Sequence, residues 1–92
     1  MPQDNWGDMS ERRLELFRQI GHEADRGKQL HDVGPPVRPI ETWLIILMEE
    51  VGEAAQAALE IDPLEFKREI IQCAAVCLSI LEIGCIEDGG QL

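Results

Sequence analysis

The chain has 92 residues, of which 45% are hydrophobic, and its 18 acidic and 8 Lys or Arg residues give a formal net charge of −10. This length suffices for one small domain, so residues 1–92 are expected to form a single domain with flexible ends at 1–8 and 85–92. The charge argues against nucleic acid and anionic membranes as partners, because nothing neutralises a row of phosphates. A cation, or a ligand that arrives with cations, fits better.

The first residues, MPQDNWGD, are polar and acidic, unlike a signal peptide. The longest run without charge, Ile70 to Leu81, is too short to cross a bilayer. Cys73, Cys77 and Cys85 lack a CxxC spacing and are expected to be small core residues in a reducing compartment. The sequence therefore predicts a cytoplasmic protein.

A first helix is expected from an N-cap at Ser10 to about Gln29. Its apolar side chains share one face, which consists of Leu14, Leu16, Phe17, Ile20 and Ala24. Gly21 and Gly27 weaken its second half. Residues 31–39, HDVGPPVRP, contain three prolines and a glycine and are predicted to form a loop.

A second helix is predicted from near Pro39 to about Glu60. Its apolar positions follow helical spacing and are Trp43, Leu44, Leu47, Met48, Val51, Ala55 and Ala58. Trp43 has the chemistry to stack on a base, but its spacing from Leu47 favours a core position.

A third helix is predicted from an N-cap at Asp62 to about Ile83, with Gly84 as its C-terminal cap. Pro63 suits the first turn, and Glu65 is expected to complete an acidic version of the capping box with Asp62. Between Ile70 and Leu81 only Gln72 and Ser79 are polar, and a stretch of helix that is apolar nearly all round must be covered on several sides. With two other helices in the chain, the expected cover is another subunit. The predicted fold is all-α, with three main helices per chain in a bundle completed by oligomerisation.

Four polar residues are predicted to meet on the second and third helices. Glu50 and Glu53 lie three residues apart on one helical face, and Glu69 and Gln72 repeat this spacing. The short connection makes the two helices antiparallel neighbours. Glu53 lies eight residues before Ile61 and Glu69 eight residues after it, so both pairs are expected at the same height.

Carboxylates that converge on one point repel one another, and this repulsion must be offset. Two of them about 5 Å apart at an effective dielectric near 20 repel by roughly 3 kcal/mol. Three would therefore either take up protons or hold a cation. Because the donors are oxygen atoms without histidine or cysteine, the pattern favours Mg²⁺ or Mn²⁺ over zinc. The alternative is a hydrated acidic surface, since glutamate is common on helices.

The sequence EEVGE at 49–53, followed after fifteen residues by EIIQ at 69–72, resembles the EExxE…ExxD signature of the MazG-like, all-α nucleoside triphosphate pyrophosphohydrolases. The continuation EIIQCAAVCLSILE is similar to a short bacterial and phage-type branch, and the likeness covers about residues 40–83. The resemblance implies dimers or tetramers of helical subunits. It also implies Mg²⁺-dependent cleavage of nucleoside triphosphates to the monophosphate and pyrophosphate.

The resemblance makes Glu50, Glu53 and Glu69 metal ligands. Glu49 would orient or deprotonate the attacking water. Gln72 stands where the signature has aspartate; its carbonyl oxygen can still coordinate an ion or hold a water, but it adds no charge. This departure weakens the expected metal affinity and leaves activity open.

Three cationic residues are candidates for contacts with substrate phosphates: Lys67, Arg68 and Arg38. Their alternative is a solvated position without a ligand. His22 and His31 lie away from the carboxylates in sequence and are expected at the surface. Two other functions remain open: a nucleotide- or metal-binding module without turnover, and a structural helical oligomer.

Overall fold

A computed structural model describes residues 10–31 and 40–83. It contains α1 (Glu11–His31), α2 (Ile40–Leu59) and α3 (Pro63–Ile83), with no strand in these ranges. The all-α prediction is confirmed, and each helix begins and ends within about two residues of its predicted bounds. Several predictions fall outside the described residues: the flexible ends, the loop over 32–39, the caps at Pro39 and Gly84, and the position of Cys85.

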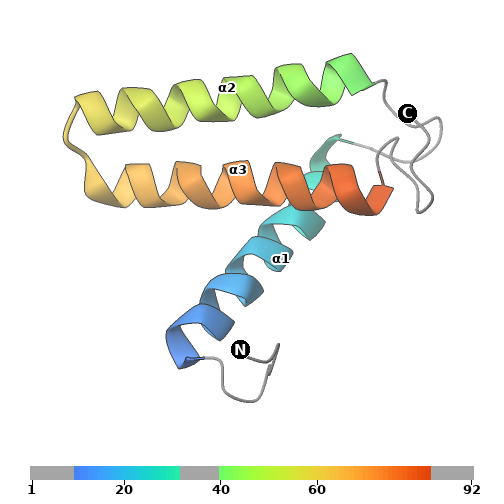
Figure 1. The fold of residues 1–92 in the computed structure, drawn as a ribbon, viewed down its shortest axis with the longest axis horizontal. Coiled ribbons are helices and arrows are strands. Elements are labelled where there is room, and N and C mark those ends of the chain that lie inside the picture. The colour runs from blue at the N-terminus through green and yellow to red at the C-terminus, as the bar shows by residue number, and fades with distance from the viewer. Residues whose placement is uncertain (1–9, 32–39, 84–92) are drawn as a thin grey trace, which may run out of the picture.

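The central helix is α3, which packs against both α1 and α2, whereas the described backbones of α1 and α2 do not meet. Figure 1 shows α2 and α3 lying antiparallel along their whole length, with α1 crossing α3 obliquely. The predicted antiparallel hairpin of α2 and α3 is therefore confirmed. A side chain on α2 that faces α3 can therefore form a site with the α3 residues that lie at the same level along the helix axes.

Ser10 caps α1 as predicted. Its side-chain Oγ accepts a hydrogen bond from the backbone N–H of Arg13 at 3.2 Å, and its carbonyl accepts one from Leu14 at 3.1 Å. The helix continues two residues beyond the predicted end and includes Gly27. One face of α1 carries Leu16, Ile20 and Ala24 toward α3, and Ala24 is buried. Burial of this face stabilises the helix despite the weak propensity of its glycines.

The turn between α2 and α3 is a Schellman motif. The N–H of Ile61 donates to the carbonyl of Ala58 at 3.1 Å, and the N–H of Asp62 donates to that of Ala57 at 3.0 Å. Ile61 adopts a left-handed φ of 54°, a conformation that usually selects glycine. The connection is therefore as tight as the sequence predicted, but with a β-branched residue at its strained position.

Asp62 begins α3 as predicted, because its Oδ1 accepts a hydrogen bond from the N–H of Glu65 at 3.1 Å. The reciprocal half of the predicted capping box is wrong. The N–H of Asp62 already donates to α2, and the Glu65 carboxylate instead accepts a bond of 2.6 Å from Arg68. The Schellman motif takes the donor that the box requires.

The core of the single chain is thin. Among the residues whose burial is described, the buried apolar side chains are those of Trp43 and four alanines: Ala24, Ala54, Ala57 and Ala75. Trp43, which is 5% exposed, occupies the predicted core position. The small residues allow the helices to approach closely, but they bury little surface. Cys73 is half-buried and Cys77 is exposed, so the prediction of a core position is wrong for Cys77 in the single chain.

Large apolar side chains cover the solvent side of the hairpin. On α2 a stripe at spacings of four, three and four residues consists of the large side chains of Leu44, Met48 and Val51 and the small one of Ala55. On α3, Phe66, Ile70 and Leu81 are also exposed. None of the helices in the described ranges is long and apolar enough to cross a membrane.

Candidate metal centre

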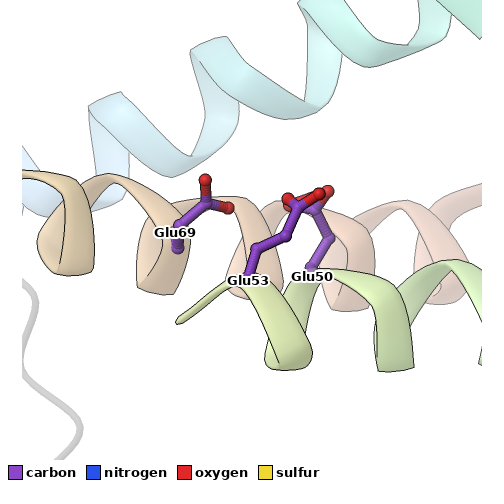
Figure 2. Close-up of side chains that lie close together, drawn as sticks. All are labelled: Glu50, Glu53 and Glu69. Carbon is purple, nitrogen blue, oxygen red and sulfur yellow. The ribbon is translucent and has the colours of Figure 1, made fainter. Parts of the chain in front are cut away.

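Three of the predicted ligands meet between α2 and α3. Glu50, Glu53 and Glu69 each offer a carboxylate oxygen, and these oxygens lie within 4.8 Å of one another. Figure 2 shows the carboxylates of Glu50 and Glu53 side by side on α2 and that of Glu69 turned toward them from α3. The register counted from the turn therefore places these residues correctly.

Glu69 is the most perturbed member of this group, which we call the acidic triad. The carboxyl is half-buried, and its Oε1 is inaccessible to solvent and has no hydrogen-bond partner among the described residues. Burial raises the pKa of Glu69 to about 7; a hydrogen bond with Glu65 and the negative charges of Glu53 and Glu50 act in the same direction. Glu69 therefore holds its proton near neutral pH unless a positive charge replaces it.

The thiol of Cys73, one turn further along α3, is affected by the same negative charges. Its pKa is raised first by burial and then by the negative charge of Glu50, with smaller contributions from Cys77 and Glu69. The neutral thiol is thus favoured, and Cys73 lacks the thiolate character of a nucleophile. Its role beside the acidic triad is to pack.

Gln72, the predicted fourth ligand, has a different partner in the structure. Its Nε2 donates a part-buried hydrogen bond of 2.7 Å to Oε2 of Glu23 on α1. Glu23 is also held by Arg26, whose Nε lies 2.6 Å from Oε1. The Arg26 guanidinium, and after it the Gln72 amide, keep the pKa of Glu23 below its usual range, so Glu23 is ionised. Only Oε1 of Gln72 remains for an ion.

The other predicted site residues lie outside the acidic triad. Glu49 is exposed on α2, and its carboxylate is not among those that converge in the described residues. Lys67 and Arg68 are exposed and line a groove between α3 and α1. His22 is at the surface, as predicted. Arg38 and the side chain of His31 lie outside the described residues.

The sequence analysis missed Glu23. A signal for it was present, because Glu23 follows Ile20 by three positions and Leu16 by seven, which places an acidic residue on the apolar stripe of α1. A carboxylate at such a position needs a partner from the helix that covers it. Gln72 is that partner.

Comparison with known proteins gives no relative. No family model matches the chain, and no curated protein or solved structure matches it either. The resemblance to the MazG-like enzymes therefore stays a prediction from the sequence of residues 40–83, chiefly from the signature residues at 49–53 and 69–72.

Proposed function

We propose that the protein is a Mg²⁺- or Mn²⁺-dependent nucleoside triphosphate pyrophosphohydrolase of the MazG-like type, which removes unwanted nucleotides from the cytoplasmic pool. The observation that carries the proposal is the convergence of Glu50, Glu53 and Glu69 within 4.8 Å. These are the three acidic positions at which the signature predicts metal ligands. A hydrated acidic surface does not require residues from two helices to meet at one height.

The chemistry of the acidic triad fits a hard divalent cation. All its donors are carboxylate oxygens, which Mg²⁺ and Mn²⁺ prefer. A cation among them opposes both the burial and the negative charges that raise the pKa of Glu69, and it gives the buried Oε1 of Glu69 a partner. Few protein ligands leave room for waters and for substrate phosphates around the ion.

The proposed reaction is hydrolysis at the α-phosphorus. Glu50, Glu53 and Glu69 would hold the ion, which when bound supplies positive charge for the phosphates and a fixed position for water. Glu49 would accept the proton that this water loses. The water oxygen bonds to the α-phosphorus, the bond to the α–β bridging oxygen breaks, and pyrophosphate leaves with that oxygen. Lys67 and Arg68 would offset the charge of the departing phosphates.

The same proposal includes assembly into a homodimer or homotetramer. Met48 is 65% exposed and Leu81 66% exposed, and both belong to the apolar solvent side of the hairpin. Apolar stripes on adjacent helices are what a second helical pair covers in a bundle. A thin core of alanines leaves a chain of this length in need of such burial.

Gln72 favours a second candidate, a nucleotide- or metal-binding module without turnover. The residue adds no negative charge where the signature has aspartate, and its amide is engaged by Glu23. The Glu49 carboxylate is not among those that converge in the described residues, so the predicted base does not join the acidic triad there. A module of this kind would bind Mg²⁺ and nucleotide but release no pyrophosphate.

Release of pyrophosphate from a panel of normal and damaged nucleoside triphosphates tests the proposal, with Mg²⁺ or Mn²⁺ present. We expect turnover by the parent protein and none by Glu69→Gln. Glu60→Gln is the matched control, since Glu60 is an exposed carboxylate in the turn after α2 and lies outside the acidic triad. Failure of every triphosphate to turn over removes the catalytic claim.

Stabilisation by the ion separates the remaining candidates. A cation that binds only the folded chain raises the melting temperature by mass action. If Mg²⁺ stabilises the protein without turnover, the binding module is correct. If Mg²⁺ has no more effect than NaCl of equal ionic strength, the chain is a structural oligomer.

A further inference from the structure

A groove with a volume of about 630 Å³ lies between α1 and α3. Its α1 wall runs from Glu15 to Arg26 and its α3 wall from Leu64 to Gln72, each wall being one face of its helix. Because α1 crosses α3 obliquely (Figure 1), the two walls are inclined to one another. Gln72 lies three residues from Glu69, so this end of the groove adjoins the acidic triad.

The groove concentrates positive charge in an acidic protein. It is lined by four of the eight Lys and Arg residues of the chain: Arg18, Arg26, Lys67 and Arg68. Two carboxylates, those of Glu15 and Glu23, line it as well. The groove therefore has more Lys and Arg side chains than carboxylates, although the formal net charge of the whole chain is −10. An anion repelled by the rest of the surface is therefore attracted here.

The cations of the groove are available to a ligand. Arg18 pairs with Glu15 at 3.1 Å, but their side chains are 69% and 57% exposed, and such pairs hold their members weakly. Arg68 pairs with Glu65 in the same way. Lys67 forms no ion pair with any described residue. Guanidinium groups can exchange an exposed carboxylate for a phosphate, because their fork of donors fits two oxygens of either group.

Arg26 is less free than the others. It donates to both oxygens of Glu23, at 2.6 and 3.0 Å, and Glu23 in turn accepts from Gln72. This chain of bonds closes the end of the groove beside the acidic triad. Arg26 therefore positions Glu23, whereas Arg18, Lys67 and Arg68 remain for the ligand.

We propose that the groove binds the β- and γ-phosphates of the substrate, the part that leaves as pyrophosphate, with Arg18, Lys67 and Arg68 as their contacts. The inference rests on the proposed function, because that function places the α-phosphate at the acidic triad. It adds a role for α1, which the signature residues of α2 and α3 do not include. The bound phosphates extend away from Gln72, along the α1 wall.

Binding of inorganic pyrophosphate to the full chain in EDTA, measured by titration calorimetry, tests the groove without a metal or a nucleotide. We expect Arg18→Gln and Lys67→Gln each to weaken this binding about tenfold, as the loss of one charged contact does. Arg12→Gln is the matched control, because Arg12 is an exposed α1 arginine that does not line the groove. Far-UV circular dichroism verifies that each variant is folded.

Three results overturn the inference, two of them in the binding experiment. The parent protein fails to bind pyrophosphate in EDTA, or Arg12→Gln weakens binding as much as Arg18→Gln, which reveals a general effect of net charge. The proposed function can fail independently of the groove. If no nucleotide is turned over but Arg18→Gln loses pyrophosphate binding, the catalytic proposal is wrong and the groove is still supported. If nucleotides are turned over, and both kcat/KM and inhibition by pyrophosphate are unchanged in Arg18→Gln, the groove is not the phosphate site and the proposed function still holds.

Discussion

Gln72 of α3 and Glu23 of α1 are joined by a part-buried hydrogen bond of 2.7 Å across 49 positions of sequence. The bond fixes the side chain at the last position of the signature and ties the crossing helix to the hairpin. Because glutamine donates where aspartate cannot, the departure from the signature is matched by the carboxylate of Glu23. The two residues therefore form one unit.

Gln72→Asp replaces the donor of this unit with a second negative charge. Without metal we expect a loss of about 1–2 kcal/mol in the free energy of unfolding, because the hydrogen bond is lost and two carboxylates meet. With Mg²⁺ we expect a larger stabilisation than in the parent protein, since a fourth carboxylate joins the acidic triad. Urea unfolding in EDTA and in excess Mg²⁺ measures both effects.

Gln72→Ala is the control for this change, because it removes the bond without adding charge. Its loss in EDTA is expected to be about 1 kcal/mol, with no gain in the response to Mg²⁺. Equal responses to Mg²⁺ in the aspartate and alanine variants would show that position 72 does not face the ion.

The raised pKa of Glu69 predicts a stability that falls with pH. In the unfolded chain this carboxyl has its ordinary pKa of 4.5, whereas in the folded chain its pKa is about 7. The contribution is therefore fully present below 4.5 and is lost as the pH rises through 7. Glu23, whose pKa is lowered first by Arg26, acts in the opposite direction and loses its contribution as the pH falls.

A comparison of Glu69→Gln with the parent protein isolates the first effect. At pH 8 in EDTA we expect the variant to be more stable by about 1–2 kcal/mol, a value reduced for the access that solvent has to the carboxylates. At pH 4 the two proteins should be equal, since Glu69 is then neutral in both states. Glu49→Gln, at an exposed α2 position outside the acidic triad, should differ little at either pH. A gain that is the same at pH 4 and pH 8 contradicts the assignment.

Glu53→Gln tests the ligand set. In EDTA the variant should be as stable as the parent protein or more so, because the change removes one charge from the acidic triad. In Mg²⁺ at 100 times the dissociation constant, the parent should gain about 2.7 kcal/mol and the variant should gain nothing. Thermal unfolding at pH 8 follows both, with NaCl of equal ionic strength as the control. Mg²⁺ binding by the variant as tight as that of the parent disproves the proposed ligands.

The helices and the acidic triad could be predicted because they follow from local rules. The cap at Ser10 and the spacing of apolar residues determined the helices, and the tight turn at Ile61 determined the register of Glu53 against Glu69. A turn of fixed length leaves no freedom in the height at which two antiparallel helices match. The site follows from that constraint.

The angle at which α1 crosses α3 could not be predicted. The partner of Gln72 and the groove depend on this crossing, so they could not be predicted either. The connection between α1 and α2 is long enough to permit several packing angles, and the apolar stripe of α1 states only that it is covered. The exposure of Cys77 was missed for a related reason, since periodicity does not tell whether a face is buried by its own chain or by another. The half capping box at Asp62 was missed because the preceding helix competes for its N–H.

Met48→Glu tests the role of the apolar stripe on α2. The side chain is 65% exposed in the single chain, so the change itself should leave the helix intact. If a second copy covers the stripe, burial of a charge without a partner opposes assembly by several kcal/mol. We expect the parent protein to sediment as a dimer or tetramer and the variant as a monomer. Glu60→Lys, a change of charge at an exposed residue outside the stripe, should leave the assembly unchanged.

Ile61→Gly is expected to stabilise the protein. Ile61 has a φ of 54° and a side chain that is 86% exposed, so it carries the strain of the left-handed conformation without a matching burial in its own chain. A β-branched residue costs about 1–2 kcal/mol there, and glycine avoids that strain at some cost in the entropy of the unfolded chain. The net gain should be about 1 kcal/mol by urea unfolding. Ile61→Ala retains the Cβ atom and should gain less. If Ile61→Gly instead destabilises the assembled protein but not the monomeric Met48→Glu variant, the exposed isoleucine belongs to the interface between subunits, and the strain is maintained by that contact.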